Sequence, residues 1–152
     1  MTTKYTIGIF GDGGVGKTAF VRALKQKKFN PQYLPTSWYE VHSIDKTKNV
    51  RDYAGQDKYR LLPQDMSNVT SAILMYDVTN PITYKNLEYW YNLVKTQCGD
   101  IPMILLGNKV DIKDRRVFKN MIEFHKNNNL PYYEISTKTG FNMDKMIEKI
   151  NN

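Results

Sequence analysis

Cysteine, long apolar runs and flexible linkers are what this sequence has least of. Its 152 residues include a single cysteine, Cys98, which excludes an internal disulfide and fits a reducing compartment. No stretch approaches the roughly 18 apolar residues of a membrane span. The first residues lack the apolar core of a signal peptide, position 2 is not glycine, and the last residues include no cysteine to prenylate. We therefore expect a soluble protein without a membrane anchor.

Basic residues outnumber acidic ones by 22 to 15, which gives a formal net charge of +7. A positive balance favours acidic partners, among them nucleic acid. The lysines are spread along the chain, however, and no recognised nucleic-acid module is present. A solvated basic surface is therefore the preferred interpretation. Binding of a polyanion through this charge stays open as an alternative.

Short apolar runs alternate with amphipathic stretches, without a repeat, a linker or a domain boundary. This alternation predicts one α/β domain, residues 1–152, with a doubly wound, mostly parallel sheet. We expect six strands and about five helices, with the ligand at the carboxyl ends of the strands. The predicted strands are Tyr5–Phe10, Glu40–Ile44, Asn49–Arg51, Ala72–Tyr76, Met103–Leu106 and Tyr132–Ile135. The predicted helices include Thr18–Lys27, Thr83–Gln97, Val117–Asn127 and Met143–Ile150.

A phosphate-binding motif follows the first predicted strand. The pattern G-x-x-x-x-G-K-[ST] is matched in full by Gly11-Asp12-Gly13-Gly14-Val15-Gly16-Lys17-Thr18. Glycines let the backbone approach phosphate oxygens, and successive N–H groups at the start of a helix favour an anion. Lys17 is predicted to reach the β- and γ-phosphates, and the Thr18 hydroxyl to ligate Mg²⁺. The sequence therefore predicts a nucleotide site of the P-loop NTPase type, although this motif alone does not separate ATP from GTP.

A second motif, N-K-x-D, follows the predicted strand Met103–Leu106 and consists of Asn108-Lys109-Val110-Asp111. The Asp111 carboxylate can accept hydrogen bonds from both the N1–H and the 2-amino group of guanine. Adenine has neither donor and would leave the carboxylate unpaired, which costs several kcal/mol. Asn108 is predicted to support the loop and the base edge, and the Lys109 stem to lie over the ring plane. The motif therefore favours guanine and disfavours an ATP-using P-loop kinase.

Together these motifs resemble the small GTPases of the Ras superfamily, and the resemblance implies roles for further residues. Ser136-Thr137-Lys138 is similar to the S-A-K loop, whose middle residue gives a backbone N–H to the guanine oxygen. Thr36 stands at the place of the switch I threonine, which binds Mg²⁺ and senses the γ-phosphate. The family's D-T-A-G-Q is resembled by Asp52-Tyr53-Ala54-Gly55-Gln56. Asp52 would act on Mg²⁺ through bound water, the Gly55 N–H would meet the γ-phosphate, and Gln56 would orient the attacking water.

The resemblance implies a site drawn from several segments, with GTP or GDP and Mg²⁺ as its ligands. Its catalytic residues would be Gln56, Lys17 and Thr36, and its metal would be held by Thr18, Thr36 and, through water, Asp52. Hydrolysis would be slow without an activating protein, because the protein does little covalent chemistry. Phe29 is in register with an aromatic that packs against guanine in this family. The implied nucleotide contacts are Asp12, Gly13, Gly14, Val15, Gly16, Lys17, Thr18, Ala19, Phe29, Tyr33, Thr36, Gly55, Asn108, Lys109, Asp111, Ser136, Thr137 and Lys138.

Several stretches outside these motifs are similar to the Ran family in particular, and the likeness covers nearly the whole chain. It implies a switch in nucleocytoplasmic transport that is found in both nucleus and cytoplasm. The implied partners are importin-β-type transport receptors, a GTPase-activating protein and a guanine-nucleotide exchange factor. The similar stretches are Glu40-Val41-His42, Asp77-Val78-Thr79, Thr83-Tyr84-Lys85-Asn86, Gly107–Arg115, Phe124-His125 and Tyr132-Tyr133.

The sequence also departs from that family. The segment Ser43–Lys48 is much shorter than the hairpin between the family's second and third strands, and Asn49–Arg51 carries little apolar surface for a strand between helices. Arg51 replaces an aromatic residue, Tyr53 replaces threonine, and the family's C-terminal helix and acidic tail are missing, which questions recognition by Ran-binding-domain proteins. We expect the shortened hairpin to weaken the coupling between the switches. The alternative function is therefore a guanine-nucleotide-binding module with impaired switching or hydrolysis.

Overall fold

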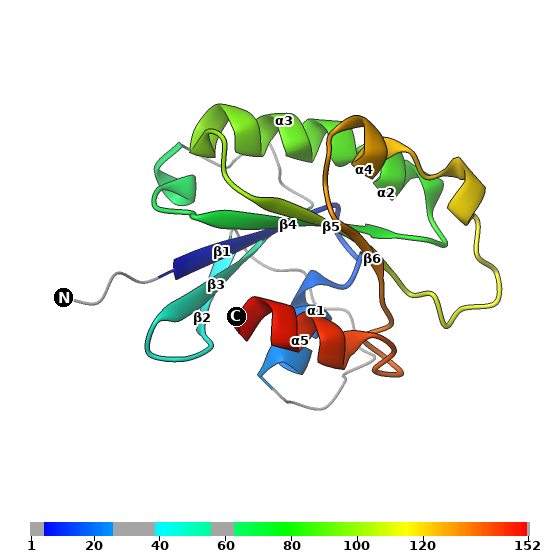
Figure 1. Cartoon of the computed structure of the whole chain (residues 1–152), viewed down its shortest axis with the longest axis horizontal. Helices are drawn as coiled ribbons and strands as arrows, with labels where there is room; N and C mark the ends of the chain where they lie inside the picture. Colours follow the sequence, from blue (N-terminus) through cyan, green and yellow to red (C-terminus); the bar gives the residue numbers. More distant parts are fainter. Residues whose placement is uncertain (1–4, 26–38, 56–62, 152) are drawn as a thin grey trace.

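The computed structural model describes residues 5–25, 39–55 and 63–151, and its centre is a six-stranded sheet (Figure 1). The strand order is β2-β3-β1-β4-β5-β6. All neighbouring strands are parallel except β2 and β3, which form an antiparallel hairpin. The predicted doubly wound α/β fold is confirmed. The strands are β1 (Tyr5–Phe10), β2 (Tyr39–Ser43), β3 (Lys48–Tyr53), β4 (Ser71–Asp77), β5 (Met103–Asn108) and β6 (Tyr132–Glu134).

Helices cover both faces of the sheet, as Figure 1 shows. One face carries α1 (Lys17–Leu24) and α5 (Met143–Asn151), and the other carries α2 (Pro81–Lys85), α3 (Leu87–Cys98) and α4 (Phe124–Asn127). Successive strand residues point to opposite faces. Ile9 therefore joins the core beneath α1 and α5, while its neighbour Phe10 joins the core beneath α3. With both faces buried, the central strands form a firm frame for the loops at their ends.

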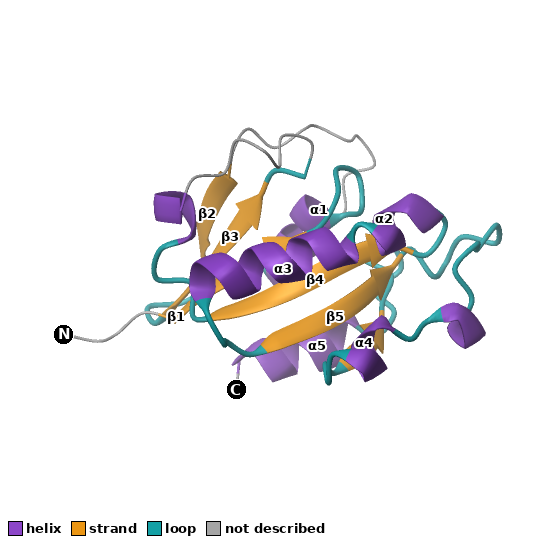
Figure 2. Ribbon diagram, turned by 90° about the horizontal axis from the view of Figure 1, so that it is seen from above, coloured by secondary structure: helices purple, strands orange, loops and turns teal. Residues whose placement is uncertain are grey.

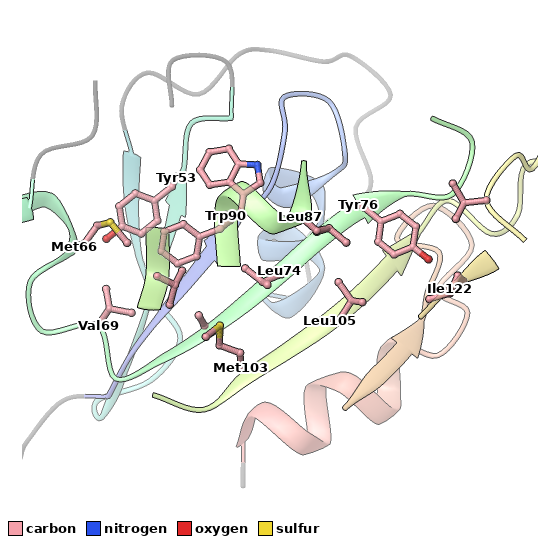
Figure 3. Packing of buried hydrophobic residues seen from close by; sticks show 14 of the residues in the cluster. Tyr53, Met66, Val69, Leu74, Tyr76, Leu87, Trp90, Met103, Leu105 and Ile122 are labelled. Carbon is pink, nitrogen blue, oxygen red and sulfur yellow. The ribbon is translucent and has the colours of Figure 1, made fainter. Parts of the chain in front are cut away.

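The short turn between β2 and β3 is closed by the Asp45 side chain together with backbone hydrogen bonds to the Lys48 carbonyl. Asp45 Oδ1 accepts hydrogen bonds from the backbone N–H of Thr47 at 2.7 Å and of Lys48 at 2.9 Å. Beyond the turn, β3 runs further than the predicted Asn49–Arg51 and ends at Tyr53. The Tyr53 ring is fully buried and stacks on Phe10, with 4.6 Å between the ring centroids (Figure 3). Tyr53 thus supplies apolar surface that the predicted segment lacked.

The predicted helix Val117–Asn127 is wrong over its first half. The N–H group of Val117 donates to the carbonyl of Val78 at 2.8 Å, which ties the segment to the end of β4. Only a short 3₁₀ helix, η3 (Lys119–Met121), follows before α4 begins at Phe124. The Tyr84 hydroxyl accepts from the N–H of Phe124 at 3.0 Å, and so satisfies a donor at the start of α4. Tertiary hydrogen bonds therefore override the helical pattern here.

The predicted helix Thr83–Gln97 is divided in two at Asn86. The backbone keeps its hydrogen bonds there, since the N–H of Asn86 donates to Ile82 and that of Trp90 donates to Asn86. The face of α3 that packs on the sheet consists of Leu87 and Trp90, which Figure 3 labels, and Val94, and all three are fully buried. In the described segments, no helix has both the length and the apolar character that crossing a membrane requires.

Candidate nucleotide-binding site

The loops that follow the parallel strands meet at one edge of the sheet. Figure 2 shows β4 and β5 ending side by side, and their last residues, Asp77 and Asn108, are register partners. The loop after β1 and the end of β3 lie at the same edge, because both strands run parallel to these two. This is where the ligand of a doubly wound fold is expected. The fold therefore brings the predicted phosphate, metal and base motifs together.

The phosphate loop turns from β1 into α1 through Gly16. Its backbone has φ 106, a left-handed conformation that side chains disfavour, and a Cβ there would lie 2.3 Å from Asn108 Nδ2. Glycine is thus required both by conformation and by the close approach of the base motif. The same turn begins α1 at Lys17, so that the N–H groups of the first helical turn face the loop.

Lys17 is held beneath the phosphate loop with only 6% of its surface exposed. Its Nζ donates to the carbonyls of Gly11 at 2.9 Å and Asp12 at 2.8 Å, which accounts for two of its three hydrogens. Burial lowers the pKa of Lys17 to about 8, and the charges of Asp52 and Asp12 oppose that shift. The ammonium is therefore charged near neutral pH, poorly solvated and placed to pair with an anion in the loop.

An oxygen pair suited to Mg²⁺ lies next to Lys17. The Thr18 hydroxyl donates to Asp52 Oδ2, and the Asp52 carboxylate is buried at the end of β3. Burial raises the pKa of Asp52, and the Thr18 hydrogen bond and the Lys17 charge oppose that rise. Hydroxyl and carboxylate oxygens fit Mg²⁺, which keeps waters and substrate phosphates among its ligands. Among the described residues no cluster of three His, Cys, Asp or Glu could hold a metal, so a dedicated protein cage is not formed there.

Asn108 joins the base motif to the phosphate loop. Its side chain is fully buried at the end of β5, and Nδ2 donates to the Val15 carbonyl at 2.9 Å. Its Oδ1 accepts from the backbone N–H groups of Lys109 at 2.8 Å and Thr137 at 3.3 Å. Three loops from different strands are thus tied to one amide. The Asn108 amide therefore links the predicted base contacts directly to the predicted phosphate contacts.

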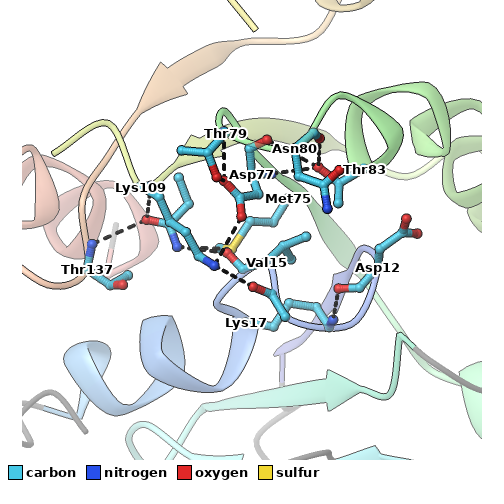
Figure 4. A network of polar contacts seen from close by, with 12 residues as sticks. Asp12, Val15, Lys17, Met75, Asp77, Thr79, Asn80, Thr83, Lys109 and Thr137 are labelled. Carbon is cyan, nitrogen blue, oxygen red and sulfur yellow. Dashed lines mark hydrogen bonds and ion pairs between the residues drawn. The ribbon is translucent and has the colours of Figure 1, made fainter. Parts of the chain in front are cut away.

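Lys109 crosses from the base motif to the phosphate loop, as Figure 4 shows. Its Nζ donates to the Gly14 carbonyl at 2.7 Å and pairs with Asp77 Oδ2 at 3.1 Å. The backbone of Lys109 has φ 70, a left-handed conformation that costs a non-glycine residue on the order of 1 kcal/mol. The contacts at both ends of the residue offset that cost. The lysine stem is therefore held across the space between the two motifs.

Asp111 and the loop after β6 complete the base side of the site. The fully buried Ser136 donates through Oγ to Asp111 Oδ1 at 2.7 Å, while Asp111 itself is exposed. Ser136 Oγ also accepts from the N–H of Thr139 at 3.1 Å, which fixes its hydroxyl direction. One carboxylate oxygen is thus oriented by the protein. Thr137 is half-buried and Lys138 exposed beside it.

A family model described as the Ras family matches residues 6–152, nearly the whole chain. The chain belongs to the Ras family. Members of this family are small GTPases that bind GTP and GDP and act as switches under activating and exchange proteins. The loops assembled above carry the motifs that are predicted to bind the guanine nucleotide of such a protein. The predicted residues Phe29, Tyr33, Thr36 and Gln56 lie outside the described residues, so their roles stay predictions.

Three further residues of this Ras-family site were missed in the sequence. Asp77 pairs with Lys109, while Asn86 and Trp90 donate hydrogen bonds to the Asp12 carboxylate at 2.6 and 2.9 Å. Asp77 directly follows a predicted strand at the ligand edge, a signal that could have marked it. Asn86 and Trp90 lie 74 and 78 positions from Asp12, and no local pattern indicates their contact.

Proposed function

We propose that this chain is a Ran-like small GTPase that cycles between GTP- and GDP-bound forms in nucleocytoplasmic transport. The observation that carries the proposal is that side chains from the Ran-like stretches make the contacts that support the site and the helices beside it. Asp77 holds Lys109, Tyr84 supports α4, and Asn86 binds Asp12 in the phosphate loop. These stretches lie outside the motifs that all small GTPases share, yet they contact them. Their retention supports a Ran-like protein within the Ras family.

GTP hydrolysis in this proposal depends on positioning and charge. Lys17 would neutralise the β- and γ-phosphates, the Gly55 N–H would meet the γ-phosphate, and Gln56 would orient the water. Mg²⁺, held by Thr18 and Thr36 with Asp52 acting through its waters, would supply further charge neutralisation. The protein adds little covalent chemistry, so turnover would be slow until an activating protein binds.

The proposed partners are importin-β-type transport receptors, a GTPase-activating protein and a guanine-nucleotide exchange factor. The protein would act as a monomer in nucleus and cytoplasm. Nucleic acid is not among the proposed partners, because the lysines are spread along the chain and no recognised nucleic-acid module is present, so the net charge of +7 is assigned to a solvated basic surface. Nucleic-acid affinity that rises steeply as salt is lowered, and persists at physiological salt, would contradict this assignment.

The deciding experiment compares the affinity of an importin-β-type receptor for the protein loaded with a GTP analogue and with GDP. We expect about a hundredfold preference for the GTP form, roughly 2.7 kcal/mol. Weak or equal binding of the two forms would leave the nucleotide site intact but reject the transport role. It would favour a guanine-nucleotide-binding module with impaired switching.

Single-turnover hydrolysis tests the enzymatic part separately. Gln56→Leu should slow the release of phosphate from bound GTP and leave GDP affinity unchanged, because Gln56 is proposed to touch only the attacking water. A rate that the substitution does not change would contradict the catalytic role of Gln56 and indicate impaired hydrolysis in the parent protein.

A further inference from the structure

The phosphate loop contains a carboxylate, Asp12, where the ligand is a polyanion. A carboxylate near bound phosphates would repel them, most strongly where water is excluded. The two ends of Asp12 face opposite directions, as Figure 4 shows. Its carbonyl accepts from Lys17 Nζ at 2.8 Å on the site side, while its carboxylate points away. The Asp12 backbone carbonyl therefore helps to hold Lys17 in the site, while the negative charge of its carboxylate is directed elsewhere.

Two side chains from the α2–α3 junction hold that carboxylate. Asn86 Nδ2 donates to Oδ2 at 2.6 Å, and Trp90 Nε1 donates to Oδ1 at 2.9 Å. Each carboxylate oxygen thus receives its own donor. Asn86 lies at the break between the helices and Trp90 is one turn later, on the same face. The Trp90 ring is fully buried in the core beneath α3, so its N–H has a fixed direction (Figure 3).

Gly55 indicates which end of the nucleotide the Asp12 carboxylate would affect. A Cβ on Gly55 would lie 2.3 Å from both Asp12 C and Gly13 N, so the backbone after β3 packs directly on this part of the loop. Gly55 is the residue whose N–H is proposed to meet the γ-phosphate. Asp12 therefore lies beside the proposed γ-phosphate position. A freed carboxylate would oppose GTP more than GDP.

We propose that Asn86 and Trp90 are positioning residues that keep the Asp12 carboxylate away from the phosphates and thereby preserve the affinity for GTP relative to GDP. This inference rests on the proposed nucleotide function and concerns which residues set its selectivity. If the contact only attached α3 to the phosphate loop, its loss would have a different consequence. It would lower the stability of the protein and weaken the binding of GTP and GDP equally, whatever the charge of residue 12.

The test measures affinities for a non-hydrolysable GTP analogue and for GDP, with Mg²⁺, in Asn86→Ala and Trp90→Phe. Trp90→Phe keeps an aromatic ring in the core, and Tyr91→Phe on the same helix is its matched control. We expect each variant to weaken the GTP analogue about tenfold, which is about 1.4 kcal/mol, and GDP less than about threefold. Thermal melting identifies any variant that fails to fold.

A second substitution separates charge from packing. Asp12→Asn placed on Asn86→Ala should restore the ratio of GTP-analogue to GDP affinity to that of Asp12→Asn alone, because no charge is left to reposition. Equal losses for both nucleotides, or a double variant as unselective as Asn86→Ala, would overturn the inference. A parent protein that binds neither nucleotide would instead refute the proposed function.

Discussion

Nucleotide affinity should fall as the pH rises above about 8, because Lys17 must be protonated to pair with phosphate. In the protein without nucleotide, burial lowers the pKa of Lys17 to about 8, with Asp52 and Asp12 opposing the shift. A phosphate ligand adds negative charge beside the ammonium and raises this pKa in the complex. Binding therefore takes up a proton wherever the pH lies between the two values. Over that window each pH unit lowers the affinity about tenfold, or about 1.4 kcal/mol.

The lowered pKa of Lys17 also affects the stability of the protein without nucleotide, which should rise with pH where the nucleotide affinity falls. A pKa lowered from 10.5 to about 8 means that the unfolded chain holds more protons between these values. The free energy of unfolding should therefore rise with pH in that window, by up to about 3 kcal/mol, as the buried ammonium loses its charge. Below pH 8 the full desolvation cost of the charged Lys17 remains. Affinity and stability thus change in opposite directions through one group.

Titration calorimetry with GDP and Mg²⁺ at pH 7, 8 and 9 measures the affinity, and chemical denaturation over the same range measures the stability. At pH 9 the wild-type affinity should be about a tenth of that at pH 7. Lys17→Met should bind weakly with a flatter profile, and any titration of the nucleotide itself persists in that variant. Lys145→Met, at an exposed position on α5, should keep the wild-type profile. Parallel profiles for wild type and Lys17→Met would refute the reasoning.

Three further predictions concern the frame. Arg51→Met should lower the free energy of unfolding, measured in urea, by about 1–3 kcal/mol, because Arg51 Nη1 donates to two backbone carbonyls, at residues 65 and 67. Arg51→Lys should recover part of the lost stability. An unchanged midpoint of urea unfolding in Arg51→Met would contradict the prediction. Gly107→Ala should lower the Tm, since its Cβ would lie 2.6 Å from the Tyr132 hydroxyl oxygen; an unaltered melting curve would show that the ring can move. Burial raises the pKa of Glu134, but hydrogen bonds from Arg115 and Tyr132 hold this pKa below its usual value. The wild type should therefore have a higher Tm than Glu134→Gln at neutral pH, and this Tm difference should disappear as the pH falls through the pKa of Glu134 in the folded protein. A Tm difference that stays constant from about pH 6 to about pH 3 would contradict the prediction.

The parts of the fold that the sequence predicts well are those that local pattern decides. Tyr5–Phe10 is a strand with the predicted bounds, and the glycine-rich turn after it leads into a helix as predicted. The prediction of a helix over Val117–Asn127 is wrong in its first half because the Val117 N–H donates to the Val78 carbonyl, and α4 begins only where the Tyr84 hydroxyl accepts from the Phe124 N–H. Those partners lie about 40 residues away, and hydrophobic periodicity contains no information about them.

In the candidate site, too, some residues could be predicted from local motifs and others could not. Motif spacing predicts site roles for Lys17, Asn108 and Asp111, since each motif lies at the end of a strand that reaches the ligand edge. Asn86 and Trp90 act through a contact with Asp12 that exists only after α3 packs on the sheet. No motif predicts it, because asparagine at a helix junction and tryptophan on a core face are both explained by local structure alone.

The phosphate loop is prepared for an anion by the groups around it as much as by its glycines. Its carbonyl oxygens at Gly11 and Asp12 accept from Lys17, and those at Gly14 and Val15 accept from Lys109 and Asn108. A carbonyl oxygen that is bound by a lysine or amide donor is not free to face an anion, which leaves the neighbouring N–H groups to bind it. Two of those donors belong to the base motif, so the predicted phosphate loop is shaped in part by the loop that is predicted to bind guanine. The Asp12 carboxylate is bound by donors as well, because Asn86 and Trp90 hold its two oxygens, which in the proposal above keeps its charge away from the phosphates.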